Sequence, residues 1–321
     1  MQEIVRVVDL KKYYEIYDAK ARQSKFVKAV DGISFSIHQG ETLGLVGESG
    51  SGKTTTGKLI LNLIKPTSGE IFLEGKSLSS LNHKEMRELR KSIQVVFQNP
   101  YAALDPKMTI RDILTEPLSI HKIVSKYDYN NEVKRLLNMV GLSESDMDKF
   151  PHEFSGGQRQ RIGIAKAIAV KPKFIICDEP VSALDVSVQS QILNLLCELQ
   201  REIKVSYLFI AHGLNVIRHV SDKVAVMYLG NIVEYGDVKT VFDECKHPYT
   251  KALISSAPIP DPNRRNNTIA LKDEIPSPIN VPDGCPFHPR CYEASDICKN
   301  KKPFLMNVSS SHAVACHLTY S

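Results

Sequence analysis

The chain has 321 residues, of which 42% are hydrophobic and 24% are charged, a balance typical of a globular protein with more than one subdomain. Its net charge of +5, from 41 basic and 36 acidic residues, is spread along the chain, so nucleic acid is not an expected partner. The first 18 residues lack the apolar core of a signal peptide, and every apolar run is too short to span a bilayer. We therefore expect a cytoplasmic protein, where a reducing environment favours metal ligands over disulfides for clustered cysteines.

The first hundred residues alternate between strand and helix patterns. Short apolar runs separated by turns predict a β-rich region over residues 1–46. Apolar residues at helical spacing predict a helix over 54–64, and "GEIFLEG" at 69–75 is typical of a strand bounded by glycines. A polar surface helix at 83–92 and a strand at 93–98 follow.

Strand patterns disappear after residue 98 and return near residue 173. The segment between is helical, and we interpret it as an inserted subdomain. Beyond it come a strand, "KFIIC", a helix over 186–203 and a strand, "SYLFI", an alternation typical of a mostly parallel α/β sheet. A proline-rich linker or irregular lobe begins after residue 236. We therefore divide the chain into a core of residues 1–98 and 167–235, a helical subdomain of residues 99–166 and a C-terminal extension of residues 236–321.

A glycine-rich stretch, "GLVGESGSGKTT", contains the pattern G-x-x-x-x-G-K-T from Gly47 to Thr54, between an apolar strand and a helix. The glycines let backbone N–H groups turn toward an anion, and the helix N-terminus adds its positive end. Lys53 would contact the β- and γ-phosphates of a nucleotide, and the Thr54 hydroxyl would bind Mg²⁺. The alternative, a glycine-rich turn with an accidental lysine, is disfavoured by these flanking elements.

An acidic pair follows the apolar run "FIIC", which predicts a buried strand. Asp178 would lie at the carboxyl end of that strand, where ligands bind in open parallel sheets, and would hold Mg²⁺ through water. Glu179 could polarise a water in line with the γ-phosphate. Two acids after a strand can also simply open a helix, but the phosphate loop favours the catalytic interpretation.

A third motif, "FSGGQRQRIGIAKAIA", places Ser155, two glycines and Gln158 before a helix with an apolar period. The local alternative is an ordinary capped helix. Together with the phosphate loop and "CDEPVSALD", however, this stretch resembles the ATP-binding-cassette ATPases, and the resemblance covers most of the chain. It implies a P-loop, RecA-like α/β core with an antiparallel β subdomain, an inserted helical subdomain and an irregular C-terminal lobe.

The resemblance also assigns roles to individual residues. Catalysis is assigned to Glu179, to the switch histidine His212 and to Gln98, which couples the nucleotide site to the membrane partner. Mg²⁺ is assigned to Thr54, Gln98 and Asp178. ATP binding is assigned to Tyr14, which would stack on adenine (Tyr13 is the alternative), and to Gly47, Glu48, Ser49, Gly50, Ser51, Gly52, Lys53, Thr54, Thr55, Ser155, Gly156, Gly157, Gln158, Asp178 and Asp185. One position departs from the family, because Gly213 follows the switch histidine where an acid is usual.

The chain carries one phosphate loop and one signature motif, so the resemblance implies that it is half of a working pair. In the family, two ATPase subunits pack head to tail, and each signature closes on the γ-phosphate of the opposite subunit's ATP. The resemblance therefore implies a homologous second ATPase subunit in a heterodimer, two separate transmembrane permeases, an extracytoplasmic substrate-binding protein as an indirect partner, and a position on the cytoplasmic face of the membrane.

Three stretches narrow the type of transporter: "FQNPYAALDPKMTI", "HPYTKALISSAPIPDP" and the cysteine-rich tail. They resemble the ATPase subunits of the oligopeptide, dipeptide and nickel importers. We therefore expect an ATP-hydrolysing motor for oligopeptide or dipeptide import. The alternatives are the same motor for nickel or a metallophore, a soluble cassette ATPase, and a non-enzymatic metal-binding subunit.

Four of the seven cysteines, Cys285, Cys291, Cys298 and Cys316, gather in the tail with the spacing C-x5-C-x6-C-x17-C. Four thiolates suit either Zn²⁺ or an iron–sulfur cluster, although zinc sites favour shorter spacings, and His288, His312 and His317 are possible substitute ligands. Unpaired thiols are the remaining interpretation. The resemblance to importer ATPases implies a [4Fe-4S] cluster, which we expect to stabilise a lobe poor in apolar residues.

Overall fold

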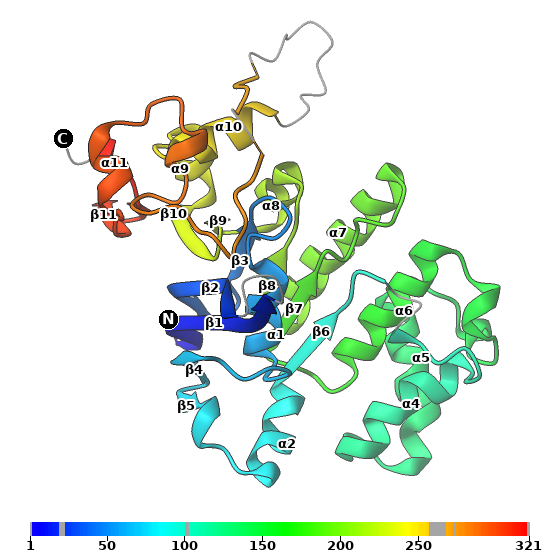
Figure 1. The fold of residues 1–321 in the computed structure, drawn as a ribbon. Helices are drawn as coiled ribbons and strands as arrows, with labels where there is room; N and C mark the ends of the chain where they lie inside the picture. Colours follow the sequence, from blue (N-terminus) through cyan, green and yellow to red (C-terminus); the bar gives the residue numbers. More distant parts are fainter. Residues whose placement is uncertain (1, 19–22, 100–102, 257–267, 272–273, 320–321) are drawn as a thin grey trace, which may run out of the picture. The chain divides into compact units, whose positions relative to one another are not determined.

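The computed structural model describes residues 2–18, 23–99, 103–256, 268–271 and 274–319 (Figure 1). The chain forms two compact units. The first unit contains the described residues of 1–4, 37–41 and 80–209, and the second contains those of 5–36, 42–79 and 210–321. In the part of the chain that the structure describes, no helix has the length and apolar character needed to cross a membrane.

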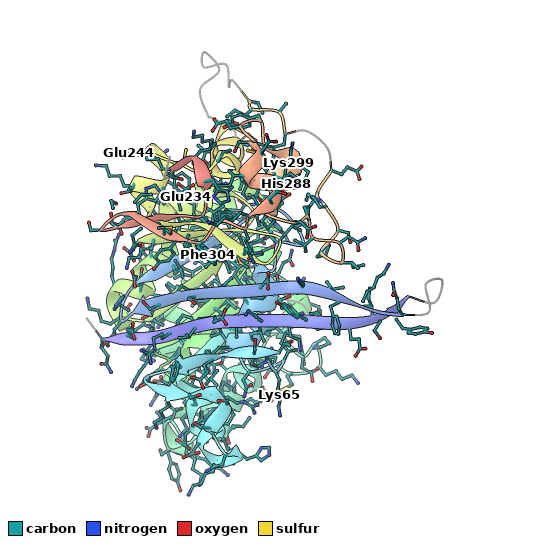
Figure 2. All side chains as sticks on the ribbon, turned by 60° about the vertical axis from the view of Figure 1, so that its left-hand side comes forward. Lys65, Glu234, Glu244, His288, Lys299 and Phe304 are labelled. Carbon is teal, nitrogen blue, oxygen red and sulfur yellow. The ribbon has the colours of Figure 1, made fainter. Side chains whose placement is uncertain are left out.

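The second unit holds a mainly antiparallel sheet with the strand order β2-β1-β4-β5. Its long strands β1 (Glu3–Asp18) and β2 (Gln23–His38) run side by side in Figure 2. Strand β1 pairs antiparallel with β4 (Ser68–Leu73), and β4 also pairs antiparallel with β5 (Lys76–Ser77). The β-rich character expected of the N-terminal residues is confirmed here.

A second group of strands in this unit carries the phosphate loop. Its order is β11-β12-β10-β9-β3, where β3 (Thr42–Val46) pairs parallel with β9 (Lys223–Tyr228), and β10 (Asn231–Asp237) pairs antiparallel with β9. All five residues of β3 are buried, as expected for a continuous apolar run in a parallel sheet. The helices of this unit are α1 (Lys53–Ile60), α8 (Leu214–Val220), α9 (Val238–Asp243), α10 (Pro248–Ser256) and α11 (Asp296–Asn300).

The tail is less irregular than expected. Strands β11 (Met306–Ser309) and β12 (His312–Val314) form an antiparallel pair, and β12 also pairs with β10. The three β12 residues are buried where they pair with β10. This short segment therefore owes its strand structure to pairing with a distant part of the chain.

The first unit contains three strands in the order β8-β7-β6. Strand β6 (Ile93–Val96) pairs parallel with β7 (Phe174–Asp178), and β8 (Ser206–Ile210) follows the helix α7 (Val186–Ile203). This confirms the predicted α/β alternation. The polar helix α2 (His83–Ser92) begins with a capping box at Asn82.

Helices α4 (Ile110–His121), α5 (Tyr129–Met139) and α6 (Gly156–Ile168) pack on one another in the first unit (Figure 1). Their apolar faces are buried, which accounts for the helical pattern of this region. Helix α6 continues two residues beyond the predicted limit of the helical subdomain at residue 166. Short 3₁₀ helices lie at Leu78–Ser80, Lys126–Asp128, Glu144–Asp146, Pro151–Glu153, His288–Arg290 and His317–Thr319.

A buried polar network joins β10 to the start of α10. The Glu234 carboxylate pairs with His312 Nε2 at 2.7 Å and accepts hydrogen bonds from the backbone N–H groups of Lys246 and His247. The His247 side chain is buried, and its Nδ1 accepts the backbone N–H of Tyr249. Burial lowers the pKa of His247 to about 4, although the Glu234 carboxylate acts in the opposite direction.

Replacing His247 with Asn is expected to reduce the loss of unfolding free energy as the pH decreases. The unfolded chain binds a proton at His247 near pH 6.5 and the folded chain only near pH 4, so stability falls as the pH decreases across this window. Wild type should lose about 3 kcal/mol more of its unfolding free energy than His247→Asn between pH 6.5 and 4. Urea titrations at several pH values measure this difference. The exposed His219→Asn is the control, and equal losses in wild type and His247→Asn would contradict the prediction.

Candidate functional site

The phosphate loop of the second unit lies between β3 and α1, as the sequence predicts. Gly47 has a φ of 150° and Gly52 a φ of 107°. A Cβ atom at Gly47 would lie 2.2 Å from the Met227 carbonyl oxygen, and one at Gly52 would lie 2.3 Å from the Ala29 carbonyl oxygen. Only glycine fits these two positions, because both the backbone angles and the neighbouring backbone exclude a side chain.

Lys53 begins α1, and its side chain is held inside the loop. Its Nζ donates hydrogen bonds to the carbonyl oxygens of Gly47 at 2.8 Å and Glu48 at 3.0 Å. The side chain is 4% exposed, whereas its neighbour Thr54 is exposed at the first turn of the helix. A buried cation and a helix N-terminus thus meet at the same loop, an arrangement suited to a phosphate group.

Glu48, within the loop, makes two contacts that the sequence analysis did not predict. Its backbone N–H donates to the Tyr249 hydroxyl at 2.9 Å, and its carboxylate forms a two-pronged ion pair with Arg290. Both partners belong to the C-terminal extension. Tyr249 lies in the motif "HPY" and Arg290 in "HPRC", which the sequence analysis used only to identify a subfamily. Nothing in the local sequence relates these motifs to a loop some two hundred residues away.

The first unit brings Gln98 and Glu179 together. Gln98 Nε2 donates to Glu179 Oε2 at 3.0 Å and lies 3.2 Å from Ser182 Oγ. Glu179 is 8% exposed and has a φ of 51°, an uncommon backbone angle for a residue other than glycine. The acid predicted to be catalytic therefore follows the end of β7, next to the half-buried Asp178, in a held orientation.

The signature residues form the N-terminus of α6. The Ser155 hydroxyl accepts the Gln158 N–H at 3.3 Å, and Gln158 Oε1 accepts the Ser155 N–H at 2.9 Å, which completes a capping box. Both side chains are exposed. A Cβ at Gly157 would lie 2.4 Å from Val188 Cγ1, so this glycine permits a close approach of α6 and α7. The capped-helix interpretation is confirmed, and it leaves the helix N-terminus open to solvent.

The remaining predicted residues belong to several different elements. His212 belongs to the second unit and is exposed, and Gly213 is the N-cap of α8. Asp185 is the exposed N-cap of α7 in the first unit. Tyr14 is 39% exposed, with Lys12 Nζ 5.0 Å from its ring centroid, whereas the Tyr13 hydroxyl donates to Asp31. Tyr14 thus has the more available ring, and its contact with adenine stays a prediction.

The predicted four-cysteine metal site is not supported. Among the residues that the structure describes, no group of three or more His, Cys, Asp and Glu side chains is arranged to hold a metal ion. Burial, with a smaller contribution from the neighbouring tail cysteines, raises the pKa of Cys285 and of Cys291 to about 11. The Cys298 sulfur lies 3.4 Å from the Ser295 hydroxyl. The sequence places the four cysteines in one segment of the chain, but it does not specify the side-chain directions that a metal site requires.

The three possible substitute ligands are also engaged elsewhere. His288 Nδ1 lies 3.0 Å from the Cys285 carbonyl oxygen, His312 pairs with Glu234, and His317 Nε2 lies 2.8 Å from the Lys301 carbonyl oxygen. Each hydrogen bond engages one ring nitrogen, and among the described residues none of the three rings is part of a group arranged to hold a metal ion.

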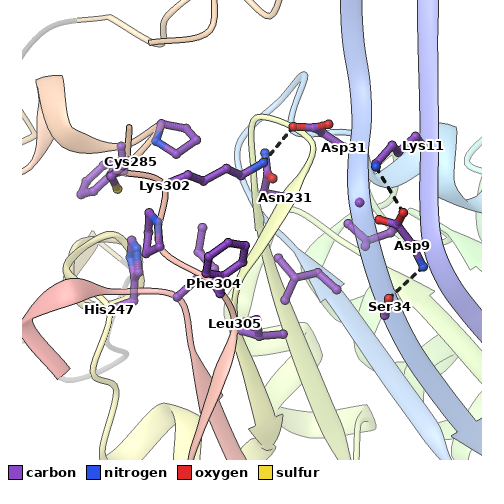
Figure 3. A pocket seen from close by; sticks show the side chains of 18 residues that line it. Asp9, Lys11, Asp31, Ser34, Asn231, His247, Cys285, Lys302, Phe304 and Leu305 are labelled. Atoms are coloured by element: carbon purple, nitrogen blue, oxygen red, sulfur yellow. Dashed lines mark hydrogen bonds and ion pairs between the residues drawn. The ribbon is translucent and has the colours of Figure 1, made fainter. Parts of the chain in front are cut away.

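A cavity of about 460 Å³ lies within the second unit, between β1, β2 and the tail (Figure 3). Its charged side chains neutralise one another, because Lys302 pairs with Asp31 at 2.9 Å and Lys11 with Asp9 at 3.2 Å. With two acids matched by two lysines, this cavity offers no excess positive charge for a polyanion, unlike the phosphate loop.

Comparisons with known proteins agree with these features. Residues 30–182 match the family described as "ABC transporter", and residues 233–298 match "Oligopeptide/dipeptide transporter, C-terminal region". The oligopeptide transport ATP-binding protein AppF of Bacillus subtilis is 49% identical, over 99% of this chain and 98% of its own. The dipeptide transport ATP-binding protein DppF of Haemophilus influenzae is 45% identical, over 98% of this chain and 96% of its own.

A solved structure extends the likeness to three dimensions. The dimeric post-hydrolysis state of the ATP-binding cassette MJ0796, bound to ADP and Pi, superposes with a TM-score of 0.64 at 28% identity. The match covers 73% of this chain and 98% of that chain.

Proposed function

The chain belongs to the ATP-binding-cassette transporter ATPases, and from this membership we propose that it is the ATP-hydrolysing motor of an importer for oligopeptides or dipeptides. The near full-length likeness to peptide-transport ATPases, which includes the C-terminal region, is the observation that carries this assignment. The resemblance drawn from the sequence motifs is thereby confirmed at the level of the family.

In the proposed reaction, the residues from Gly47 to Thr55 bind the ATP phosphates. Lys53 supplies the fixed positive charge and the backbone N–H groups of the loop supply hydrogen bonds. Glu179 orients and polarises the water that attacks the γ-phosphate, because its carboxylate is buried and held by Gln98. His212 would contact the γ-phosphate, and Tyr14 would stack on adenine.

Mg²⁺ is implied by the family, and the chemistry of the available donors fits it. Thr54, Asp178 and Gln98 offer oxygen atoms, which a hard cation prefers. Gln98 directs its Nε2 toward Glu179, which leaves the carbonyl oxygen Oε1 as the atom that would hold the ion. When bound, Mg²⁺ would neutralise charge on the phosphates.

Hydrolysis requires a second ATPase subunit in this proposal. Ser155 and its helix N-terminus are exposed and would bind the γ-phosphate at the partner's phosphate loop, with Asp185 near the interface. The dimeric state of a similar cassette supports pairing. We propose a homologous but different partner, two permease subunits, an indirectly coupled substrate-binding protein, and a position on the cytoplasmic face of the membrane.

The test reconstitutes the chain with its second ATPase subunit, permeases and binding protein in vesicles. Binding protein loaded with an oligopeptide or dipeptide should raise ATP turnover roughly tenfold over unloaded binding protein. The matched sample carries nickel or a nickel–chelator complex in place of peptide. Stimulation by that sample alone would redirect the assignment to nickel or a metallophore, and full turnover without permeases would favour a soluble ATPase.

The [4Fe-4S] cluster takes no part in this mechanism, because the described side chains do not form a ligand group. Iron, sulfide and zinc analysis of anaerobically purified protein, with Cys298→Ser as the comparison, decides the matter directly. Stoichiometric iron and sulfide that disappear in the variant would reinstate the cluster, and one zinc would reinstate the site with the other ion.

A further inference from the structure

Arg290, in the C-terminal extension, contacts the phosphate loop directly. Its Nη1 donates to Glu48 Oε2 at 2.7 Å and its Nη2 donates to Glu48 Oε1 at 3.1 Å. This is the bidentate geometry in which a guanidinium binds a carboxylate most strongly. The pair joins residues that are 242 positions apart.

The ion pair is partly shielded from solvent. The side chains of Arg290 and Glu48 are 6% and 26% exposed. The guanidinium carbon lies 5.9 Å from the Tyr228 ring centroid, and the hydrogen bonds to Glu48 raise the pKa of Arg290 further above its ordinary value. A partly shielded pair is less screened than a surface pair, and removal of one partner leaves the other charge uncompensated.

Tyr249 holds the backbone of the same loop residue. Its hydroxyl accepts the Glu48 N–H at 2.9 Å, and its ring is fully buried against Tyr228 and Phe287, with centroid distances of 4.8 and 5.3 Å. The C-terminal extension therefore fixes both the main chain and the side chain of Glu48. The Glu48 carbonyl oxygen in turn accepts a hydrogen bond from Lys53.

The contacts of Arg290 and Tyr249 with Glu48 affect how the loop would bind an anionic ligand. A free carboxylate on the phosphate loop would repel a triphosphate, and Arg290 neutralises it while restricting where the side chain can lie. We propose that Arg290 and Tyr249 are positioning residues of the nucleotide site, through which the C-terminal extension sets the affinity of the phosphate loop for nucleoside triphosphate. This inference rests on the proposed function, in which Gly47 to Thr55 bind the triphosphate.

The test is a double-mutant cycle on the full chain, with the Kd for ATP measured by calorimetry. Arg290→Gln should raise the Kd about tenfold, because the Glu48 carboxylate then faces the phosphates unpaired. The double variant Glu48→Gln/Arg290→Gln should return the Kd to within about threefold of wild type. Arg290→Lys, which keeps the charge but loses the bidentate fork, should fall between wild type and Arg290→Gln.

The control is Arg218→Gln, which removes a guanidinium from an exposed pair with Asp243 in the same unit and should leave the Kd unchanged. The inference is overturned if both Arg290 variants bind ATP as wild type does, or if the double variant stays as weak as Arg290→Gln, since a merely structural role of Arg290 would not be rescued at Glu48. A different result would contradict the proposed function itself: wild type would bind ATP no better than Lys53→Ala.

Discussion

Replacing Glu179 with Gln is expected to slow ATP hydrolysis at least about a hundredfold while ATP binding persists. The buried carboxylate accepts a hydrogen bond from Gln98 at 3.0 Å, which holds it in one orientation, and its negative charge would polarise a water. Gln has nearly the same shape but neither the charge nor the basicity. Phosphate release from the assembled transporter, measured beside ATP binding, reports the two effects separately.

Glu198→Gln provides the matched control, because Glu198 is exposed on α7 and should leave turnover unchanged. The Glu179→Gln protein should also accumulate as an ATP-bound pair of ATPase subunits, since hydrolysis is the step that reopens the pair. Turnover within about threefold of wild type would show that Glu179 is not the base. It would also remove the main argument that this chain is a motor and not a regulatory subunit.

The sequence was most informative where function depends on short motifs. Lys53 could be placed in the phosphate loop from the glycine spacing alone, and the buried strand before Asp178 could be read from four consecutive apolar residues. The Ser155 cap followed from the residue types at the start of α6. In each case the determining contacts lie within a few residues, so local chemistry is enough to predict them.

Contacts between distant segments could not be predicted in this way. Strand β12 forms because it pairs with β10, and neither segment alone indicates the other. Arg290 is a basic residue in a cysteine-rich stretch until folding places it beside Glu48. For the tail cysteines, the sequence predicted a metal site that the structure does not support. Their spacing does not determine where each thiol points or how burial raises its pKa.

Lys53→Ala is expected to weaken ATP binding at least about a hundredfold, which corresponds to roughly 2.7 kcal/mol. The Lys53 Nζ is buried in the loop, within 3.4 Å of oxygen atoms of Gly47, Glu48 and Ser51. In the variant these oxygen atoms remain, but the positive charge that would balance a phosphate is lost. Alanine is a strong helix former, so α1 should persist and the loss should be electrostatic. Titration with a fluorescent ATP analogue measures the affinity, and circular dichroism checks the fold.

The control for this variant is Lys58→Ala, which removes an exposed lysine from the last turn of the same helix and should leave the affinity within about twofold of wild type. Adenosine separates the phosphate contribution from the base contribution, because it lacks the charge that Lys53 would contact. Its weak binding should be the same in wild type and Lys53→Ala. Equal ATP affinities in the two proteins would place the nucleotide outside the loop from Gly47 to Thr55, and the roles assigned to Glu179 and Arg290 would then lose their common site.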